Sequence, residues 1–394
     1  MVGTMAKIDD SVKKKVPELR FKGFTDDWKE HKFADFIDVK SGKDYKHLNS
    51  GSIPVYGTGG YMLSVDRALS DIDAIGIGRK GTIDKPYLLK APFWTVDTLF
   101  YAVPKQNIDL QFSLSIFKKI NWKKFDESTG VPSLSKTVIN SVGASVPCYE
   151  EQQKIGSFFK QLDKTIALHQ RKLDLLKEQK KGYLQKMFPK NGEKVPELRF
   201  AGFADDWEER KLIDLATTYI GLVTTMTENY TNKGTLLIRN SDIKEGRFDL
   251  SNPIYLEEQF AEENKTRRMR KGDVVTVHTG DIGTSAMINS ELDGAIGFAT
   301  ITTRPTKELD SNFLAWYFNS NYHKKYAKRM STGDGRSNYN MKDFNKNVIP
   351  TPQIDEQQKI GAFFKQLDDT IALHQCKLDL LKEQKKGFLQ KMFV

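Results

Sequence analysis

Apolar residues recur at alternating steps of four and three along two segments, at about 150–190 and 355–394. Such spacing is a heptad pattern, and it predicts two long helices that each bury one stripe against a partner helix. At 1.5 Å per residue each helix would be roughly 50–55 Å long, far beyond an ordinary globular helix. The predicted seam of the helix pair consists of Ile155, Phe159, Leu162, Ile166, Leu173, Leu176, Ile360, Phe364, Leu367, Ile371, Leu378 and Leu381.

The two predicted helices carry nearly the same sequence, so the partner of each seam is most simply the other helix. If a pseudo-twofold axis relates the two halves of the chain, the helices must run antiparallel. The seam then places His169 against Leu378, Leu173 against His374, and Phe159 against Phe388. The alternative is that each helix packs only on its own globular body.

The segment before each globular body is repeated as well. The motif Lys-Val-Pro-Glu-Leu-Arg-Phe at 15–21, with Asp-Asp-Trp at 26–28, returns at 194–200 and 205–207. Likewise Glu-Gln-Gln-Lys-Ile-Gly at 151–156 returns at 356–361, and each copy is followed by Phe-Phe-Lys-Gln-Leu-Asp. The sequence between these landmarks does not repeat. A duplicated frame with two dissimilar bodies is what a reader of two different half-targets requires.

The two bodies, at about 29–148 and 208–354, contain short β-forming runs separated by glycine turns. A helix is predicted at 311–318, with Ser311 or Asn312 as its N-cap. The fold class is therefore α/β, with two mixed α/β domains, two long antiparallel coiled-coil helices and a pseudo-twofold internal duplication. The predicted divisions are a first domain at 1–149, a central helix at 150–190, a second domain at 191–354 and a distal helix at 355–394.

Charge narrows the class of partner. The 394 residues carry a formal net charge of +10, which suits a partner with negative charge along its length, and nucleic acid is the leading candidate. No run approaches the 18–20 apolar residues of a spanning helix, and the first residues lack an apolar signal core, so we expect no membrane partner and a cytoplasmic location. Cys148 and Cys376 stand at unrelated positions and predict neither a metal site nor a disulfide.

Motifs associated with catalysis are weak. Gly-Ile-Gly-Arg-Lys-Gly at 76–81 matches the dinucleotide-binding glycine pattern, but Pro86 falls where the required helix should run, which favours a glycine hairpin. Asn-Pro-Ile-Tyr at 252–255 differs from the Asn-Pro-Pro-Tyr of adenine methyltransferases and predicts a turn. Walker loops are missing from the sequence, and His278 and His323 have no nucleophile or metal set nearby. We therefore predict no catalytic residues and no metal site.

Polar and basic loop residues are the better candidates for function, because Arg, Lys, Asn, Thr and Tyr side chains pair with phosphates and base edges. Each such loop is weak evidence alone, since most polar loops are merely solvated. The candidate DNA-binding residues are Lys43, Tyr45, Tyr56, Arg79, Lys80 and Thr82 in the first body and Arg239, Asn240, His278, Thr279, Arg336, Asn338 and Tyr339 in the second.

One junction carries a resemblance that extends over nearly the whole chain. Thr-Gly-Val-Pro-Ser-Leu-Ser-Lys at 129–136 leads to Val146-Pro147 and to Glu-Gln-Gln-Lys-Ile at 151–155. This arrangement resembles the DNA-specificity subunit of Type I restriction-modification systems. The second half differs, because 331–338 lacks Val-Pro-Ser, although Val348-Ile349-Pro350 and the Glu-Gln-Gln-Lys-Ile-Gly motif remain.

The resemblance implies that each body is a target-recognition domain for one half of an interrupted site in double-stranded DNA. It also implies that the helices separate these domains and dock two methyltransferase subunits, with two restriction (motor) subunits as further partners left open. The chain itself would then be non-catalytic and hold no cofactor, while S-adenosylmethionine, and ATP with Mg for restriction, belong to the partner subunits. Two other classes remain: a protein-only coiled-coil scaffold whose bodies bind other ligands, and a self-sufficient methyltransferase.

Overall fold

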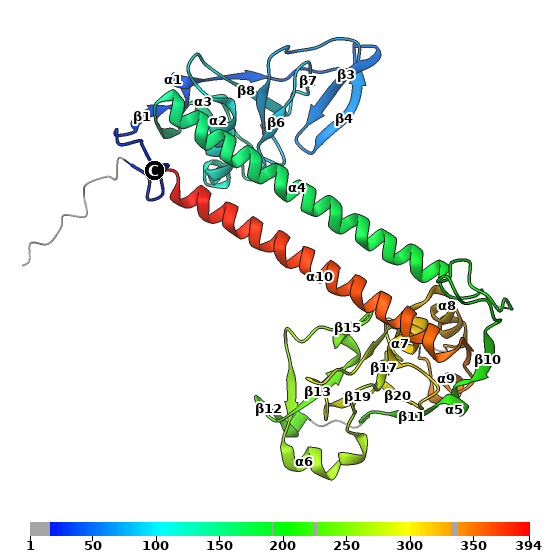
Figure 1. The fold of residues 1–394 in the computed structure, drawn as a ribbon. Coiled ribbons are helices and arrows are strands. Elements are labelled where there is room, and N and C mark those ends of the chain that lie inside the picture. Colours follow the sequence, from blue (N-terminus) through cyan, green and yellow to red (C-terminus); the bar gives the residue numbers. More distant parts are fainter. Residues whose placement is uncertain (1–15, 191, 224–226, 332–337) are drawn as a thin grey trace, which may run out of the picture. The chain divides into compact units, whose positions relative to one another are not determined.

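The computed structural model describes residues 16–190, 192–223, 227–331 and 338–394 (Figure 1). It divides into two compact units. Unit 1 takes the chain up to Gln170 together with Cys376–Val394, and unit 2 comprises Arg171–Gln375. Each unit therefore contains one of the two bodies and a part of each long helix, α4 (Tyr149–Lys186) and α10 (Ile354–Lys391).

Body 1 is built from short strands and four short helices. A four-stranded antiparallel sheet has the order β2-β8-β5-β6, a three-stranded sheet has the order β4-β3-β7, and β1 pairs with β9. The strands are β1 (Lys29–Lys32), β2 (Ile37–Ser41), β3 (Ser50–Gly57), β4 (Gly60–Val65), β5 (Ala74–Gly78), β6 (Tyr87–Leu89), β7 (Trp94–Thr95), β8 (Leu99–Pro104) and β9 (Gly143–Val146). The helices are α1 (Phe33–Phe36), α2 (Leu110–Lys119), η1 (Trp122–Phe125) and α3 (Lys136–Ser141).

The glycine-rich segment of body 1 forms the predicted hairpin. Strand β5 pairs antiparallel with β6, with Gly76 opposite Tyr87. The connection after Gly81 contains no helix and passes through Pro86 into β6. A phosphate-binding helix N-terminus is therefore absent from this segment, and the dinucleotide-binding alternative is excluded here.

Body 2 repeats this class of architecture with different strands. One antiparallel sheet has the order β11-β20-β17-β18, a mixed sheet has the order β12-β16-β13-β19, and two further pairs are β14-β15 and β10-β21. The strands are β10 (Glu208–Lys211), β11 (Ala216–Ile220), β12 (Tyr230–Thr231), β13 (Thr235–Arg239), β14 (Ile243–Lys244), β15 (Arg247–Phe248), β16 (Ile254–Leu256), β17 (Val274–Thr276), β18 (Ser285–Met287), β19 (Ile296–Phe298), β20 (Ile301–Pro305) and β21 (Val348–Thr351).

The helices of body 2 include the one predicted from its apolar run. They are α5 (Leu212–Leu215), η2 (Thr227–Asn229), η3 (Asn240–Asp242), α6 (Glu258–Glu263), η4 (Lys265–Arg267), α7 (Ser311–Asn319), α8 (Asn321–Met330) and α9 (Met341–Phe344). The predicted N-cap of α7 was wrong, because the cap is Asp310, whose carboxylate accepts from Phe313 N–H. A carboxylate one residue earlier reaches the free amides of the first turn, so Ser311 and Asn312 lie inside the helix.

Contacts within each unit show that α4 and α10 are antiparallel. In unit 1 the ring of Phe158, near the start of α4, packs edge-on against Phe388, near the end of α10, with centroids 5.0 Å apart. In unit 2 Tyr183, near the end of α4, packs in the same way against Phe363, near the start of α10, also at 5.0 Å. The antiparallel pairing and the duplication are thus confirmed, and packing of each helix on its own body alone is excluded. The predicted partner of Phe388 was one residue off, because Phe159 instead packs against Phe393 at 5.8 Å.

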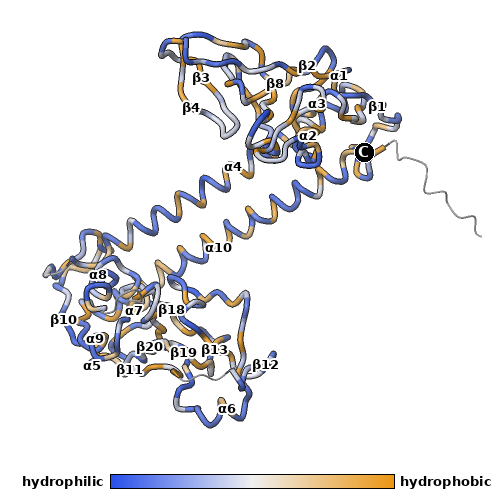
Figure 2. The backbone as a smooth tube through the Cα atoms, turned by 180° about the vertical axis from the view of Figure 1, so that it is seen from behind, coloured by the Kyte–Doolittle hydropathy of each residue, from blue (hydrophilic) through white to orange (hydrophobic). Residues whose placement is uncertain are grey.

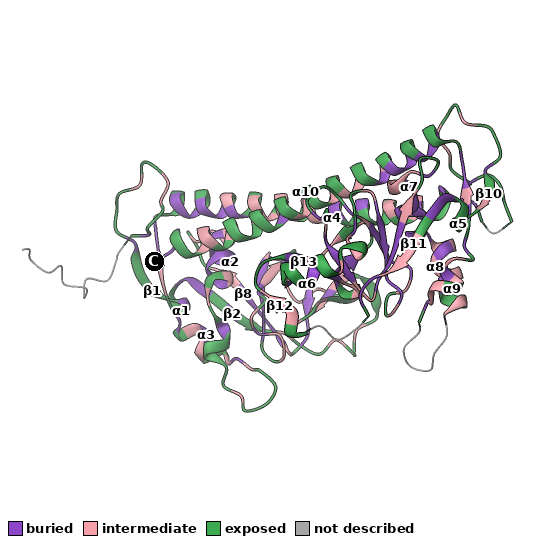
Figure 3. Cartoon of the chain, turned by 90° about the horizontal axis from the view of Figure 1, so that it is seen from below, coloured by how far each residue is buried: buried purple, intermediate pink, exposed green. Residues whose placement is uncertain are grey.

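The predicted seam residues are the covered side chains of both helices. Among them Ile155, Phe159, Leu173, Leu176, Ile360, Phe364 and Leu378 are buried, and Leu162, Ile166, Leu367, Ile371 and Leu381 are partly buried. Figure 2 shows hydrophobic and hydrophilic stretches alternating along both helices, and Figure 3 shows the matching alternation of buried and exposed residues. None of the helices in the described part of the chain is long and apolar enough to span a membrane.

The repeated motifs tie each body to its long helix through one buried ion pair. In unit 1 the guanidinium of Arg20 donates two hydrogen bonds to the carboxylate of Glu151, at 2.7 and 2.8 Å. In unit 2 Arg199 donates to Glu356 with the same two distances. Both carboxylates are almost fully buried. A forked guanidinium satisfies both oxygens of a buried carboxylate, which explains why Arg and Glu recur together in the two frame copies.

The glutamine and glycine of the repeated motif have equally specific places. Gln152 accepts from Asp109 N–H at 3.0 Å, and Asp109 is the N-cap of α2. A Cβ at Gly156 would lie 2.3 Å from the Asp109 carboxylate, so only glycine lets the two helices approach here. The second half repeats this joint with Gln357 and Asp310 at 2.8 Å. The repeated segments therefore form the same joint twice, and each joint attaches one of two unlike bodies to a long helix.

Candidate nucleic-acid interface

Body 1 has a cavity of about 640 Å³ between three loop segments. Its walls are residues 44–46, the turn between β3 and β4 at 57–62, and residues 96–98. Gly60 takes a backbone φ of +109°, which favours glycine and allows the tight turn of this hairpin. The cavity opens where three irregular segments meet, which is the usual setting of a recognition surface on a rigid sheet.

Backbone hydrogen bonds fix the three walls to one another. Lys43 N–H donates to Thr95 O at 2.8 Å, and the indole of Trp94 donates to Lys43 O at 2.8 Å. Val96 N–H donates to Tyr56 O at 3.0 Å. The side chains that face the cavity are thus presented by a bonded framework, and ordering them on a ligand costs little backbone entropy.

Arg79 and Lys80 are held against the third wall. Their backbone N–H groups both donate to Thr98 O, at 2.8 and 3.3 Å. On the other side Gly81 N–H donates to Pro132 O at 2.8 Å, and Leu134 N–H donates to Arg79 O at 2.9 Å. The Val-Pro-Ser junction therefore holds the basic turn in place, while the side chains of Arg79 and Lys80 remain exposed.

One of the six candidate residues of body 1 lines this cavity, and the other five lie on segments next to it. Tyr45 lines it, and Lys43, Tyr56, Arg79, Lys80 and Thr82 lie on segments that border its walls. Sequence reasoning missed Tyr61 and Met62, which line the cavity and are 63% and 50% exposed. Their only sequence signal is an aromatic residue directly after a Gly-Gly turn. Exposed aromatic and thioether groups beside lysines combine stacking surface with phosphate-binding charge.

In body 2 four of the candidates form one polar cluster. His278 N–H donates to the Asn240 side-chain oxygen at 3.4 Å, and His278 Nδ1 lies 3.0 Å from Asn338 Oδ1. Because an amide oxygen only accepts, Nδ1 carries the proton in this arrangement. Thr279 pairs with Asn338 in an isolated β-bridge. The amide of Asn240 also donates to Ala299 O at 2.8 Å, so this side chain is held by the fold. The hydroxyl of Thr279 and the amide of Asn338 are suited to base edges in the major groove.

Two other candidates of body 2, Arg239 and Tyr339, have side chains that are committed to the fold. The guanidinium of Arg239 is taken up by Asp242, at 2.8 and 2.7 Å, and by the carbonyl of Asn252 at 2.9 Å, and Asp242 raises the pKa of Arg239. Tyr339 is fully buried, and its hydroxyl accepts from Asn347 at 2.5 Å. Both assignments are corrected: these side chains hold the fold together and do not face a ligand. Arg336 lies outside the described residues.

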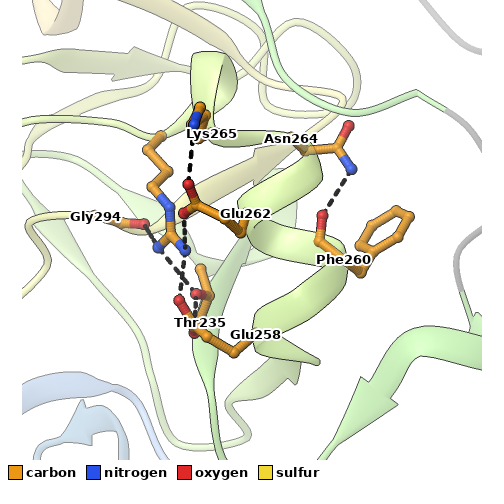
Figure 4. A network of polar contacts seen from close by, with 8 residues as sticks. Thr235, Glu258, Phe260, Glu262, Asn264, Lys265 and Gly294 are labelled. Atoms are coloured by element: carbon orange, nitrogen blue, oxygen red, sulfur yellow. Dashed lines mark hydrogen bonds and ion pairs between the residues drawn. The ribbon is translucent and has the colours of Figure 1, made fainter.

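A second basic residue of body 2 is also committed to the fold. Arg268 donates to Glu258 at 2.5 Å and to Thr235 Oγ1 at 3.0 Å. These bonds tie α6 to β13. Figure 4 shows Thr235 and Glu258 within the polar network around α6. The number of basic residues in the sequence therefore overestimates the positive charge that body 2 has available for binding an anion, because some of these residues are paired with carboxylates of the same body.

Candidate groups for chemistry are sparse. Among the described residues no group of three or more His, Cys, Asp or Glu side chains could hold a metal ion. Cys148 and Cys376 are free and exposed. Burial lowers the pKa of His323 to about 4, and its Nδ1 donates to Phe318 O at 2.8 Å, so this ring is a neutral core residue.

Comparison with known proteins gives a consistent picture. The family model "Type I restriction modification DNA specificity domain" matches residues 25–178 and 204–383. The chain is 21% identical over 330 residues to the Type I restriction enzyme MjaVIII specificity subunit of Methanocaldococcus jannaschii, covering 81% of this chain and 75% of that protein.

Solved structures of the same class share the fold. The S subunit of a Type I restriction-modification system from M. genitalium superimposes with a TM-score of 0.68 at 15% identity, covering 96% of this chain and 99% of that one. A chain from a structure on assembly and conformational transition of the Type I system gives 0.53 at 15% identity, covering 93% and 97%. At these identities the likeness concerns the fold alone.

Proposed function

This chain belongs to the Type I restriction modification DNA specificity family, and we propose that it reads a bipartite, interrupted target in double-stranded DNA and directs adenine methylation by partner subunits. One observation supports this most directly. Two bodies with unlike surfaces are each attached by the same joint, Arg20 to Glu151 and Arg199 to Glu356. The same joint repeated under two unlike bodies suits a protein in which each body reads its own half-site.

In this proposal basic side chains bind phosphates and set the position on the duplex, while polar loop groups discriminate bases. In body 1 the readers are the side chains around the 640 Å³ cavity, with Lys43, Arg79 and Lys80 as phosphate ligands. In body 2 the readers are Thr279 and Asn338, which border His278. The paired helices set the number of base pairs between the two half-sites.

Catalysis, in this proposal, belongs to other subunits. Two methyltransferase subunits would bring S-adenosylmethionine, and ATP with Mg would act in restriction subunits where these join. The duplicated helices support a partner that binds twice. Each carries two exposed leucines one heptad apart on its outer face, Leu168 and Leu175 on α4 and Leu373 and Leu380 on α10. Apolar side chains held in water at equivalent places of a repeat suit two copies of one partner.

The test is to express the full chain with a cognate methyltransferase subunit and to map methylated adenines across a genome. We expect a two-part motif with a fixed gap. Lengthening α4 and α10 together should change the gap and leave the bases of both half-sites unchanged. A single uninterrupted motif, or methylation without sequence preference, would contradict the proposal.

The two alternative classes give different results in simple assays. A protein-only scaffold would leave the assembled complex without any preference for one DNA sequence in a gel-shift assay. A self-sufficient methyltransferase would bind S-adenosylmethionine as an isolated chain, where we expect no binding. The affinity for DNA should also fall steeply as the salt concentration rises, because basic side chains that bind the phosphates release counterions from the DNA backbone.

A further inference from the structure

Unit 1 contains a second cavity, of about 320 Å³, that none of the arguments above uses. Its lining consists of Lys118, Lys119, Lys382, Lys385, Lys386, Leu389 and Gln390. We call this the lysine pocket. Five ammonium groups around one small apolar patch make a surface whose chemistry selects anions.

The fold brings these lysines together from segments that are far apart in the sequence. On α10 the positions 382, 385, 386, 389 and 390 follow helical spacing and share one face. Lys118 and Lys119 form the last turn of α2, where cations are favoured by the negative end of the helix dipole. Both groups of lysines lie on regular helices, so the fold itself brings them together.

Carboxylates balance only part of this charge. Lys118 and Lys385 share one partner, Asp163, at 2.8 and 2.5 Å. Lys386 lies 3.9 Å from Glu383, and Lys382 has no carboxylate within ion-pair distance among the described residues. The ammonium of Lys119 donates to Val394 O at 2.7 Å and lies over the ring of Phe393, and burial lowers its pKa. The pocket is thus left with excess positive charge that a bound anion would neutralise.

The second unit does not contain the same set. The lysines of α10 recur on α4 as Lys177, Lys180 and Lys181, because that part of the sequence is duplicated. Helix α7 corresponds to α2, since each begins at an Asp N-cap with Phe three residues later. Where α2 ends in two lysines, however, α7 ends in Asn319 and continues with Ser320. Among the described residues the five-lysine arrangement therefore occurs once.

The five-lysine arrangement occurs in only one of the two described units. It therefore suits a ligand that presents different surfaces to the two units. A partner that binds twice would use the repeated surfaces, whereas an interrupted target presents unlike DNA to the two units. We propose that the lysine pocket binds the phosphodiester backbone of the DNA next to the half-site read by body 1. The contact is independent of base sequence and adds affinity and register to the readers of the 640 Å³ cavity. This inference rests on the proposed function.

The test compares two double variants of the full chain in complex with its methyltransferase. Lys382→Ala with Lys386→Ala removes two exposed lysines of the pocket and leaves the Asp163 contacts intact. Lys177→Ala with Lys181→Ala removes the same charge from the same face of α4 and serves as the control. Thermal melting of both variants checks that the fold is unchanged. Affinity is measured on target and non-target duplexes from about 50 to 200 mM salt.

We expect the pocket variant to lose about tenfold in affinity at low salt on both duplexes, and its slope of log affinity against log salt to fall by roughly one to two. The control should show a clearly smaller loss. Equal losses of DNA affinity in the two variants, or no loss in the pocket variant, would overturn the inference. The inference would also be overturned if the pocket variant bound the methyltransferase more weakly but kept its affinity for DNA, because the pocket would then be a protein contact. In each of these cases wild-type recognition of a two-part target would still stand.

Discussion

Lys180 donates to Asp368 at 2.6 Å within unit 2, and at the equivalent positions of the repeat Lys385 contacts Asp163 at 2.5 Å within unit 1. The same antiparallel ion pair is thus built twice, but its surroundings differ. At Asp163 burial is outweighed by hydrogen bonds from Lys118 and Lys385, which hold its pKa below the usual range. At Asp368 burial dominates and raises the pKa, despite Lys180.

This difference predicts opposite results for one substitution at two equivalent sites. Asp163→Asn should destabilise unit 1 at pH 7 by about 1–2 kcal/mol, because two partly buried ammonium groups lose their shared acceptor. Asp368→Asn should be neutral or slightly stabilising, because burial disfavours the charged carboxylate at this site more than its contact with Lys180 favours it. Thermal melting at pH 7 measures both. Equal destabilisation by the two variants would contradict the assignment.

The pH dependence follows from the directions of the two shifts. A lowered folded pKa at Asp163 contributes stability at neutral pH that is lost as the pH falls through that folded value, below the ordinary Asp range. The raised folded pKa of Asp368 means that its charged form lowers the stability of the folded protein at neutral pH. This destabilisation disappears as the pH falls through the raised pKa and the carboxylate is protonated. The gap between the melting temperatures of the two variants should therefore narrow on acidification.

The helix pair could be predicted because the sequence pattern that specifies it is local and occurs twice in the chain. A heptad seam at 150–190 and 355–394 specifies long helices, and nearly identical copies specify the partner. The joint was not predictable in detail. That Gln152 binds the N-cap of α2, or that Gly156 lies against Asp109, depends on contacts between segments that have no periodic signature.

The candidate DNA-binding residues show that the type of a residue alone is a poor guide to whether its side chain is available for binding. Arg239 and Tyr339 have the side chains that a DNA reader needs, yet one is paired with Asp242 and the other is buried. Burial and internal pairing are tertiary properties, so composition of a loop cannot reveal them. Conversely, the lysine pocket combines α2 with α10, and neither segment alone indicates an anion site.

Gly42 offers a test of the first recognition cavity. A Cβ there would lie 2.0 Å from Val96 O, so alanine must push back the 96–98 wall. We expect Gly42→Ala to cost about 2 kcal/mol of stability or more and to weaken binding to the target. Gly59→Ala, in another wall of the same cavity, is the control, because a Cβ there has nothing within 4 Å. Melting temperature and DNA affinity report the two effects, and equal behaviour of the two variants would show that the wall geometry is unimportant.

The frame ion pair predicts a large effect from a single residue. Arg20→Met would leave the buried carboxylate of Glu151 without its guanidinium, which typically costs about 3 kcal/mol. For a unit of this size that corresponds to a melting temperature lower by roughly 6–12 °C. Arg20→Lys should recover only part of it, because an ammonium cannot reproduce the forked contact. As a control, Glu197→Gln removes an exposed partner of Lys186 and should change little.

His323 predicts acid sensitivity of unit 2. Its folded pKa is depressed from 6.5 to about 4 by burial, so its contribution to stability is complete above the unfolded value and is lost as the pH falls toward the folded one. The loss approaches about 3 kcal/mol at pH 4. His323→Asn keeps a donor for Phe318 O and removes the titration, so its melting temperature should fall less between pH 6.5 and 4.

The exposed leucines of the helices predict the stoichiometry of the proposed complex. Leu168→Glu with Leu175→Glu should abolish binding of one methyltransferase subunit, and Leu373→Glu with Leu380→Glu should abolish binding of the other, because charge on an apolar docking face must be desolvated. Native mass spectrometry of the two double variants should therefore give one methyltransferase per chain, and the quadruple variant should give none. All four side chains are exposed in this structure, so the fold should tolerate the changes. Retention of two methyltransferase subunits by either double variant would place the docking surface elsewhere on the chain.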